Sequence, residues 1–124
     1  MIIGTGIDIV EIARFRKILA GTGNRFLDRV FTPEEQRFCL ARRDPAPHFA
    51  ARFAAKEAVF KALGTGWSNG VTWLDAEVRR QDHGAPVIML HGVASEIAAS
   101  KSVGRIHLSL THTNNCAAAT AILE

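Results

Sequence analysis

The sequence has no tyrosine, only two cysteines and no long apolar run. Cys39 and Cys116 show neither the spacing of a metal site nor a secreted disulfide framework, so we expect reduced thiols. No segment approaches the ~20 apolar residues needed to cross a bilayer, and the N-terminus lacks the basic lead of a signal peptide. These absences predict a cytoplasmic protein that does not associate with a membrane.

Nucleotide-binding and nucleic-acid-binding signatures are missing as well. There is no P-loop, dinucleotide fingerprint, helix-turn-helix or zinc-finger pattern. The formal net charge is only +3, but the first half of the chain is crowded with basic residues, namely Arg14, Arg16, Lys17, Arg25, Arg29, Arg37, Arg42, Arg43, Arg52, Lys56 and Lys61. This asymmetry favours a phosphorylated small molecule or an acidic protein as partner, and we expect no nucleic acid.

What is present predicts one α+β domain over residues 1–124. Hydrophobic content of 48% and charged content of 22% are ordinary for a globular protein, and there are no repeats or linkers. Helical signals gather in the first half and strand alternation in the second. Expected helices cover 11–20, 24–30, 33–41, a central stretch that follows a break at 44–47, and 92–102; expected strands cover 2–10, 71–80, 86–91, 105–113 and 116–123.

Local signals mark several of these boundaries. Thr32 followed by Pro33 and Glu35 predicts a capping box at a helix start. Turn chemistry at 82–84 joins two expected strands. The 105–113 strand alternates apolar residues with His107, Ser109 and Thr111, which predicts a half-buried strand, and places His112 on the opposite face from those three.

The central helix carries charges where a packed helix should have none. At about 100° per residue, four large apolar residues form one face and six alanines form another. The charged residues of this helix, which are Arg52, Lys56, Glu57 and Lys61, therefore lie beside or between two packed faces. Buried charges need partners or ligands. Glu57 and Lys61 could be a simple helix ion pair, but Arg52 and Lys56 repel each other unless an anion is near.

Other candidate residues have equally plain structural interpretations. Asp8 ends the first strand before a helix, so it could cap that helix or, with Glu57, hold Mg²⁺ through hard carboxylate oxygens. The Gly64-Thr65-Gly66 run could cap a helix C-terminus or line a pocket with loop amides. Ser109 and His112 point to opposite faces of the expected strand, so they are unsuited to act as a nucleophile and its base and suit anion or sugar contacts better.

Together, three blocks of sequence resemble the holo-acyl-carrier-protein synthase family, which are small 4′-phosphopantetheinyl transferases. The blocks stand in family order and cover nearly the whole chain: Gly4-Thr5-Gly6-Ile7-Asp8-Ile9-Val10-Glu11, Arg52-Phe53-Ala54-Ala55-Lys56-Glu57-Ala58 and Ser109-Leu110-Thr111-His112-Thr113. The resemblance implies a long central helix packed on a small antiparallel sheet. It also implies a homotrimer with active sites where subunits meet.

The resemblance further implies a reaction. Phosphopantetheine would move from coenzyme A to a serine of apo-acyl carrier protein, in support of fatty acid biosynthesis, with release of adenosine 3′,5′-bisphosphate. Asp8 and Glu57 would hold Mg²⁺, Lys61 would balance the pyrophosphate charge, and Glu57 or a water beside it would accept the serine proton.

The remaining expected contacts are to the nucleotide and to the carrier protein. Arg52 and His112 would bind the 3′-phosphate of coenzyme A, and the rest of the pocket would be lined by Gly64, Thr65, Gly66 and Ser109. Arg14, Lys17 and Arg25 would dock the acidic carrier protein. Two other functions stay open from the residues alone: a non-catalytic module that binds an acidic protein, and a Mg²⁺-dependent pyrophosphate hydrolase that needs no acceptor.

Overall fold

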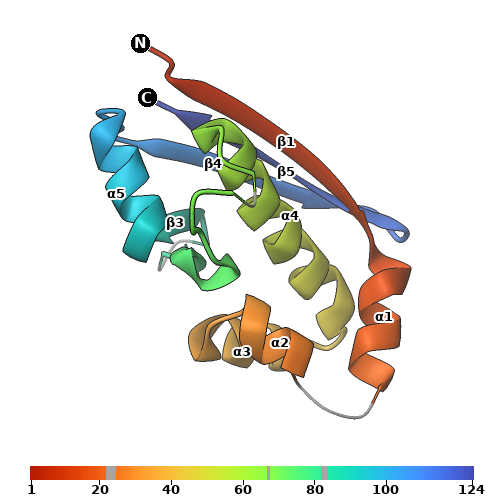
Figure 1. The fold of residues 1–124 in the computed structure, drawn as a ribbon. Coiled ribbons are helices and arrows are strands. Elements are labelled where there is room, and N and C mark those ends of the chain that lie inside the picture. The colour runs from red at the N-terminus through yellow and green to blue at the C-terminus, as the bar shows by residue number, and fades with distance from the viewer. Residues whose placement is uncertain (22–24, 67, 82–83) are drawn as a thin grey trace.

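In the computed structural model, which describes residues 1–21, 25–66, 68–81 and 84–124, one long helix lies against a three-stranded antiparallel sheet (Figure 1). The strands are β1 (Gly4–Glu11), β4 (Ile106–His112) and β5 (Cys116–Leu123). Their order is β1-β5-β4, so the first and last strands of the chain are paired. The expected α+β class is therefore confirmed, as is the central helix on a small antiparallel sheet.

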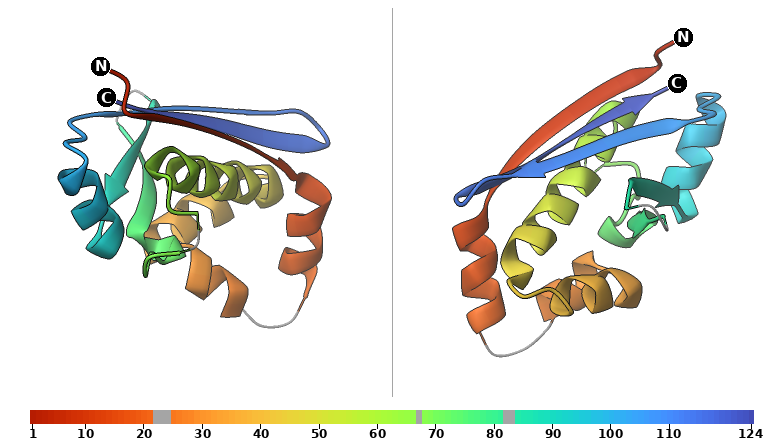
Figure 2. Two further views of the ribbon diagram at one scale, coloured as in Figure 1. Left: turned by 45° about the horizontal axis from the view of Figure 1, so that its top comes forward. Right: turned by 180° about the vertical axis from the view of Figure 1, so that it is seen from behind.

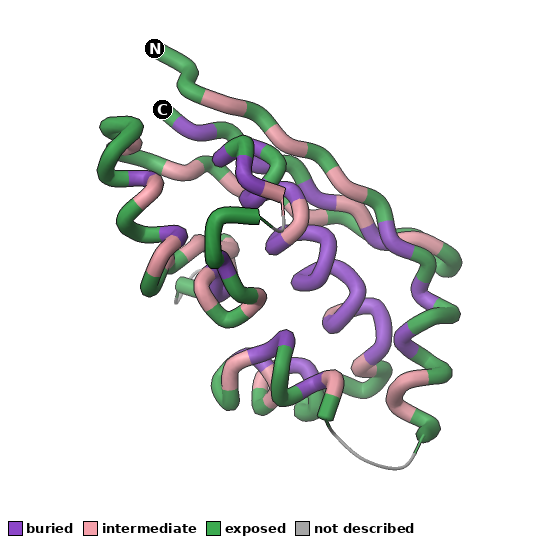
Figure 3. The backbone as a smooth tube through the Cα atoms, in the orientation of Figure 1, coloured by how far each residue is buried: buried purple, intermediate pink, exposed green. Residues whose placement is uncertain are grey.

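Helix α4 (Pro45–Leu63) is the centre of the molecule. It packs on one face of the sheet, and its other sides contact α1 (Ile12–Ala20), α3 (Pro33–Leu40) and β2 (Ala76–Arg80) (Figure 2). The remaining elements are α2 (Arg25–Val30), α5 (Gly92–Ser100) and β3 (Pro86–Leu90), which forms a hairpin with β2. Most of α4 is buried, as Figure 3 shows. The two packed faces expected from its sequence are both present.

The opposite face of the sheet is covered by none of the described elements (Figure 2). Strand alternation turns Ile7, Ile9 and Ile122 to this face, where they are 65%, 68% and 37% exposed. A row of large exposed apolar residues on a sheet is unusual for an isolated domain. None of the described helices is long and apolar enough to cross a membrane.

Several expected boundaries are confirmed and two are wrong. The capping box at the start of α3 forms as expected, with Thr32 and Glu35 bonding reciprocally. Residues 44–47 were expected to break the chain, but α4 begins at Pro45, since a proline in the first turn removes an N–H that has no helical partner. The expected 71–80 strand begins only at Ala76, because residues Trp73–Asp75 form a 3-10 turn closed by Thr72 and Asp75.

Two expectations touch positions outside the described residues. The expected second helix began at Asn24, and α2 is described from Arg25 onward. The expected turn between β2 and β3 includes Asp82 and His83, which also lie outside the described residues. The flanking strands pair in the expected antiparallel register, with Arg80 opposite Pro86.

Candidate active site

Two glycines bring β1 into direct contact with the backbone of α4. A Cβ atom at Gly4 would lie 2.1 Å from the carbonyl oxygen of Ala62, and one at Gly6 would lie 1.8 Å from that of Ala58. No side chain larger than hydrogen fits at either position. Because alternate residues of a strand share a face, Asp8 is the next residue of β1 to point at α4. The glycine spacing thus sets the distance at which Asp8 meets the helix.

Asp8 and Glu57 line one small cavity. It has a volume of about 320 Å³ and is bounded by Asp8, Ile9, Val10, Glu11, Arg14, Phe53 and Glu57. Loss of hydration raises the pKa of Glu57, and the negative charge of Asp8 raises it further. Two carboxylates that disfavour each other's charge in one cavity form an environment that a cation would relieve.

Lys61 completes this cluster from one turn further along α4. Its Nζ donates to the Ile7 carbonyl oxygen at 2.9 Å and to Asp8 Oδ1 at 3.1 Å. Among the described residues its ion pair is with Asp8, in place of the helical pair with Glu57 that the spacing allowed. The Lys61 side chain is half exposed, contrary to the expectation that all four charges of α4 lie between packed faces, so its amine can also reach a ligand.

The donor set suits a magnesium ion that shares its ligands with a substrate. No group of three or more His, Cys, Asp and Glu side chains that could hold a metal occurs in the described part of the chain. Mg²⁺ often uses only one or two carboxylates and takes the remaining oxygens from phosphates and water. Asp8 and Glu57 fit that requirement, whereas a metal that needs a full protein cage would not be held here.

Arg14 belongs to the same site. Its guanidinium lies 4.9 Å from the centre of the Phe53 ring, and it lines the cavity of the two carboxylates. Its positive charge opposes the upward shift of the Glu57 pKa. Lys17 and Arg25 are exposed, on the last turn of α1 and at the start of α2. The expected basic surface therefore begins at the edge of the carboxylate cavity.

Arg52 lies in a different cavity, on another side of α4. It is 2% exposed, and its Nε has no hydrogen-bond partner among the described residues. The guanidinium lies 4.0 Å from the centre of the Phe38 ring, and Arg80 faces the same ring at 5.2 Å. This cavity of about 490 Å³ is lined by Glu34, Phe38, Arg52, Val78, Arg79 and Arg80. A buried guanidinium with an unused donor is suited to an anionic group.

His112 lies in a neighbouring basic cavity. Its ring is 6.0 Å from that of His48, and the cavity, of about 460 Å³, is lined by Arg16, Arg42, Arg43, Asp44, Pro47, His48, His112, Thr113 and Asn114. Arg42 also faces Phe38, at 4.4 Å, so one aromatic ring separates the two basic cavities. Phe38, His48 and Arg80 were not predicted as site residues. The signal in the sequence that could have indicated these basic cavities was the pair of arginines Arg42 and Arg43, which directly precedes the central helix.

The other expected nucleotide contacts lie apart from Arg52 within one chain. Gly64 caps the C-terminus of α4 in the left-handed conformation, with φ of 79°, and at 1.5 Å per residue it is about 18 Å from Arg52. Thr65 is buried, and its hydroxyl donates to the Gly66 carbonyl oxygen at 3.2 Å. Ser109 is exposed on the uncovered face of the sheet, opposite Thr120. One chain does not gather these residues into a single pocket.

Comparison with known proteins agrees with this geometry. Residues 4–121 match the model of the 4′-phosphopantetheinyl transferase superfamily. The chain is 49% identical, over 100% of its length and 99% of the relative's, to the holo-[acyl-carrier-protein] synthase of Koribacter versatilis (strain Ellin345).

Solved structures similar to this chain are also holo-[acyl-carrier-protein] synthases. The holo-[acyl-carrier-protein] synthase of Neisseria meningitidis superposes with a TM-score of 0.89 at 31% identity, covering 100% of this chain and 99% of that one. The Bacillus anthracis synthase in complex with CoA (3′,5′-ADP) superposes with a TM-score of 0.81 at 36% identity, covering 100% and 97%. Sequence and fold thus agree, and the chain belongs to the holo-[acyl-carrier-protein] synthase family of 4′-phosphopantetheinyl transferases.

Proposed function

We propose that this protein transfers 4′-phosphopantetheine from coenzyme A to a serine of apo-acyl carrier protein and releases adenosine 3′,5′-bisphosphate. The observation that carries the proposal is the cluster of Asp8, Glu57 and Lys61, in which two carboxylates line one cavity and a half-exposed amine pairs with the first of them. The relatives named above, which are holo-[acyl-carrier-protein] synthases, support the same reaction. A role in fatty acid biosynthesis and a cytoplasmic location stay predictions.

In this reaction the serine oxygen attacks the β-phosphorus of the coenzyme A pyrophosphate, and the bond from that phosphorus to the bridging oxygen breaks. Asp8 and Glu57 would hold Mg²⁺, which when bound neutralises charge on the pyrophosphate. Glu57, or a water beside it, accepts the serine proton. Lys61 stabilises the negative charge that develops on the leaving phosphate.

The 3′-phosphate of coenzyme A is assigned to the basic residues around Phe38. Arg52 presents a buried, unused Nε there, and His112 lies in the adjoining basic cavity. Arg14, Lys17 and Arg25 are assigned to the acidic carrier protein. Because Arg14 also lines the carboxylate cavity, a carrier protein docked on this surface would present its serine close to Glu57.

We further propose that the active protein is a homotrimer whose sites form between subunits. Two observations support a second copy at each site: the exposed isoleucines of the uncovered sheet face, and the separation of Gly64–Gly66 and Ser109 from Arg52 within one chain. Mixing the inactive variants Asp8→Asn and His112→Ala after partial unfolding and refolding should then restore some activity. Sites built within single chains would give no restoration.

The decisive experiment incubates apo-acyl carrier protein with coenzyme A and Mg²⁺ and follows the mass of the carrier. A gain equal to one phosphopantetheine, absent with Asp8→Asn, is expected. Cleavage of coenzyme A without a carrier protein would favour the pyrophosphate hydrolase. Binding of the carrier with neither mass gain nor cleavage would favour the non-catalytic module.

A further inference from the structure

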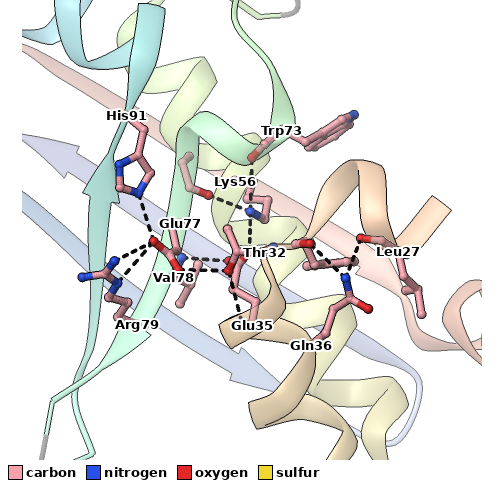
Figure 4. Close-up of polar contacts among 12 residues, drawn as sticks. Leu27, Thr32, Glu35, Gln36, Lys56, Trp73, Glu77, Val78, Arg79 and His91 are labelled. Atoms are coloured by element: carbon pink, nitrogen blue, oxygen red, sulfur yellow. Dashed lines mark hydrogen bonds and ion pairs between the residues drawn. The ribbon is translucent and has the colours of Figure 1, made fainter. Parts of the chain in front are cut away.

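A buried ion pair lies on the side of α4 that faces away from β1. Lys56 is fully buried, and its Nζ donates to Glu35 Oε1 at 2.8 Å, to the Trp73 carbonyl oxygen at 3.1 Å and to the Ala76 carbonyl oxygen at 2.7 Å (Figure 4). The three acceptors belong to α3, to the 3-10 turn and to the start of β2. An ammonium group has three donors, so Lys56 has none left for a substrate.

Glu35 is equally occupied. Its Oε1 also accepts from the Thr32 backbone N–H, and its Oε2 accepts from the Val78 backbone N–H, both at 2.8 Å. Thr32 in turn donates from its hydroxyl to Glu77 at 2.9 Å, and Glu77 accepts from Arg79 and contacts His91 (Figure 4). The pair therefore joins α4 to the beginning of α3 and to β2 through fully used donors and acceptors.

An ion pair of this kind contributes little net stability, because removing both charges from water costs about as much as their attraction returns. Its distinctive property is geometry. Three hydrogen bonds to three separate segments fix the position of the Lys56 nitrogen in all three dimensions. They therefore restrict both the rotation of α4 about its axis and its sliding along that axis.

The contact of α4 with β1 is restrained differently. Gly4 and Gly6 lie against the backbone at Ala58 and Ala62, and the Lys61 amine bonds to the Ile7 carbonyl oxygen and to Asp8. The glycines fix how closely the strand and helix approach, but the Lys61 side chain is long and half exposed, so it opposes sliding of the helix less than a fully buried pair does. Glu57 follows Lys56 directly, so any shift of the helix moves Glu57 relative to Asp8.

We propose that Lys56 and Glu35 are positioning residues that set the separation of the Asp8 and Glu57 carboxylates. This inference rests on the proposed function, in which those carboxylates hold a metal ion. It assigns to the lysine of the central motif a role distinct from ligand binding. The pair acts through the placement of α4 and touches neither coenzyme A nor the carrier protein.

The test uses the double variant Lys56→Met/Glu35→Gln, which removes both buried charges and so leaves neither unpaired. The probe is Mn²⁺ in the presence of coenzyme A, followed by electron paramagnetic resonance of the free ion. We expect Mn²⁺ to bind about 10-fold to 100-fold more weakly per folded molecule. The kcat should fall in parallel, while KM for the carrier protein stays near the wild-type value, since Lys17 and Arg25 are untouched.

A matched control separates positioning from stability. Leu123→Ala removes a fully buried side chain at the far end of β5, opposite Gly4, and leaves the ion pair intact. It should cost about 2–5 kcal/mol of folding free energy with wild-type Mn²⁺ affinity per folded molecule. Equal loss of Mn²⁺ affinity in this control would overturn the proposal, because the effect would then follow stability alone.

Two further outcomes are decisive. Wild-type Mn²⁺ affinity and kcat in the double variant would overturn the positioning role. If instead the wild-type protein with coenzyme A binds no Mn²⁺, or Asp8→Asn binds it normally, the metal site of the proposed function fails and this inference falls with it. If the double variant does not fold, Glu35→Asp replaces it, because this variant keeps the charge but moves the carboxylate away from Lys56 by one methylene group. The same loss of Mn²⁺ affinity per folded molecule is then expected.

Discussion

Lys56 and Glu57 are neighbours in the sequence, yet they occupy opposite kinds of environment. The Lys56 amine is fully buried, and each of its donors has an acceptor in another segment. Glu57 is half-buried and faces a second carboxylate, and loss of hydration followed by the charge of Asp8 raises its pKa. A charge whose partners are all supplied by the protein thus fixes geometry, whereas a charge without such partners is available for a ligand.

Burial also acts on Lys56, where it lowers the pKa of the amine while Glu35 opposes that shift. The three acceptors around the nitrogen each require an N–H donor, so the ammonium form fits the site. No such enclosure surrounds Glu57. The same helix thus holds one charge for structure and the next for chemistry.

The largest effect is expected for Lys56→Met. The variant leaves the Glu35 carboxylate buried without its counter-ion, so the free energy of unfolding should fall by about 3–5 kcal/mol. Urea denaturation measures it. The matched variant Lys61→Met removes a half-exposed amine from the other face of α4 and should cost less than about 1 kcal/mol, while slowing transfer. Equal losses of stability in the two variants would abolish the contrast.

The next effect concerns the carboxylates. Asp8→Asn and Glu57→Gln should each lower the rate of transfer by about 10²-fold to 10³-fold, because each removes a charge that the metal needs at constant shape. Glu57→Gln should not lower the stability of the metal-free protein, since it relieves repulsion between like charges. Asp8→Asn also breaks the half-exposed pair with Lys61 and should cost less than about 1 kcal/mol. Initial rates at limiting Mg²⁺ and urea denaturation are the measurements. Near-normal rates in both variants would show that these carboxylates hold no metal.

Gly6→Ala tests the contact that places Asp8. The new Cβ would lie 1.8 Å from the Ala58 carbonyl oxygen, which belongs to the helix backbone, so β1 must move away from α4. We expect a loss of about 1–3 kcal/mol together with slower transfer. In Gly104→Ala the nearest atom to the new Cβ is 3.7 Å away, and about 0.5 kcal/mol or less is expected. A Gly6→Ala protein of wild-type stability would contradict the close approach.

A smaller effect follows from the basic surface. Lys17→Glu should raise KM for the carrier protein about fivefold, equivalent to about 1 kcal/mol, and added salt should shrink this change. Arg14→Glu should lower kcat as well, because Arg14 lines the carboxylate cavity. Arg105→Glu makes the same charge change at the start of β4, far from α1 (Figure 1), and should leave KM unaltered. A salt-independent effect of Lys17→Glu would remove α1 from the docking surface.

The smallest effect is on the pH dependence of stability. At pH values just above 4.5, the ordinary pKa of a glutamate, Glu57 is still protonated in the folded protein but is already ionised in the unfolded chain, because folding raises its pKa. This group's contribution to stability therefore falls as pH rises from about 4.5 through the folded pKa. Melting temperatures of the metal-free wild type, relative to Glu57→Gln, should decline over that window, and Mg²⁺ should reverse the decline only in the wild type. A difference that rises with pH would contradict the repulsion between Asp8 and Glu57.

Much of the local structure could be predicted from the sequence. Thr32 and Glu35 are three residues apart, and their reciprocal capping depends only on that spacing. The alternation of residues 106–112 assigned His107 and Ser109 to the exposed face for the same reason. The motifs around Asp8 and Glu57 predicted that the two carboxylates act together, and both side chains line one cavity.

Tertiary structure decided which charges are satisfied. Glu35 could be predicted as a helix cap, but its burial against Lys56, 21 residues away, depends on how α3 packs on α4. Arg52, Gly64 and Ser109 share a family pattern, yet helix length and strand alternation place them apart in one chain.

The class of the fold and the family could be predicted from the sequence, because they follow from patterns within one turn, one strand or one motif. That Lys56 is enclosed while Glu57 is left beside Asp8 depends on tertiary packing. The hydration and partners of a charge are set by segments distant in the chain, which come together only when α3, β1 and β2 pack around α4.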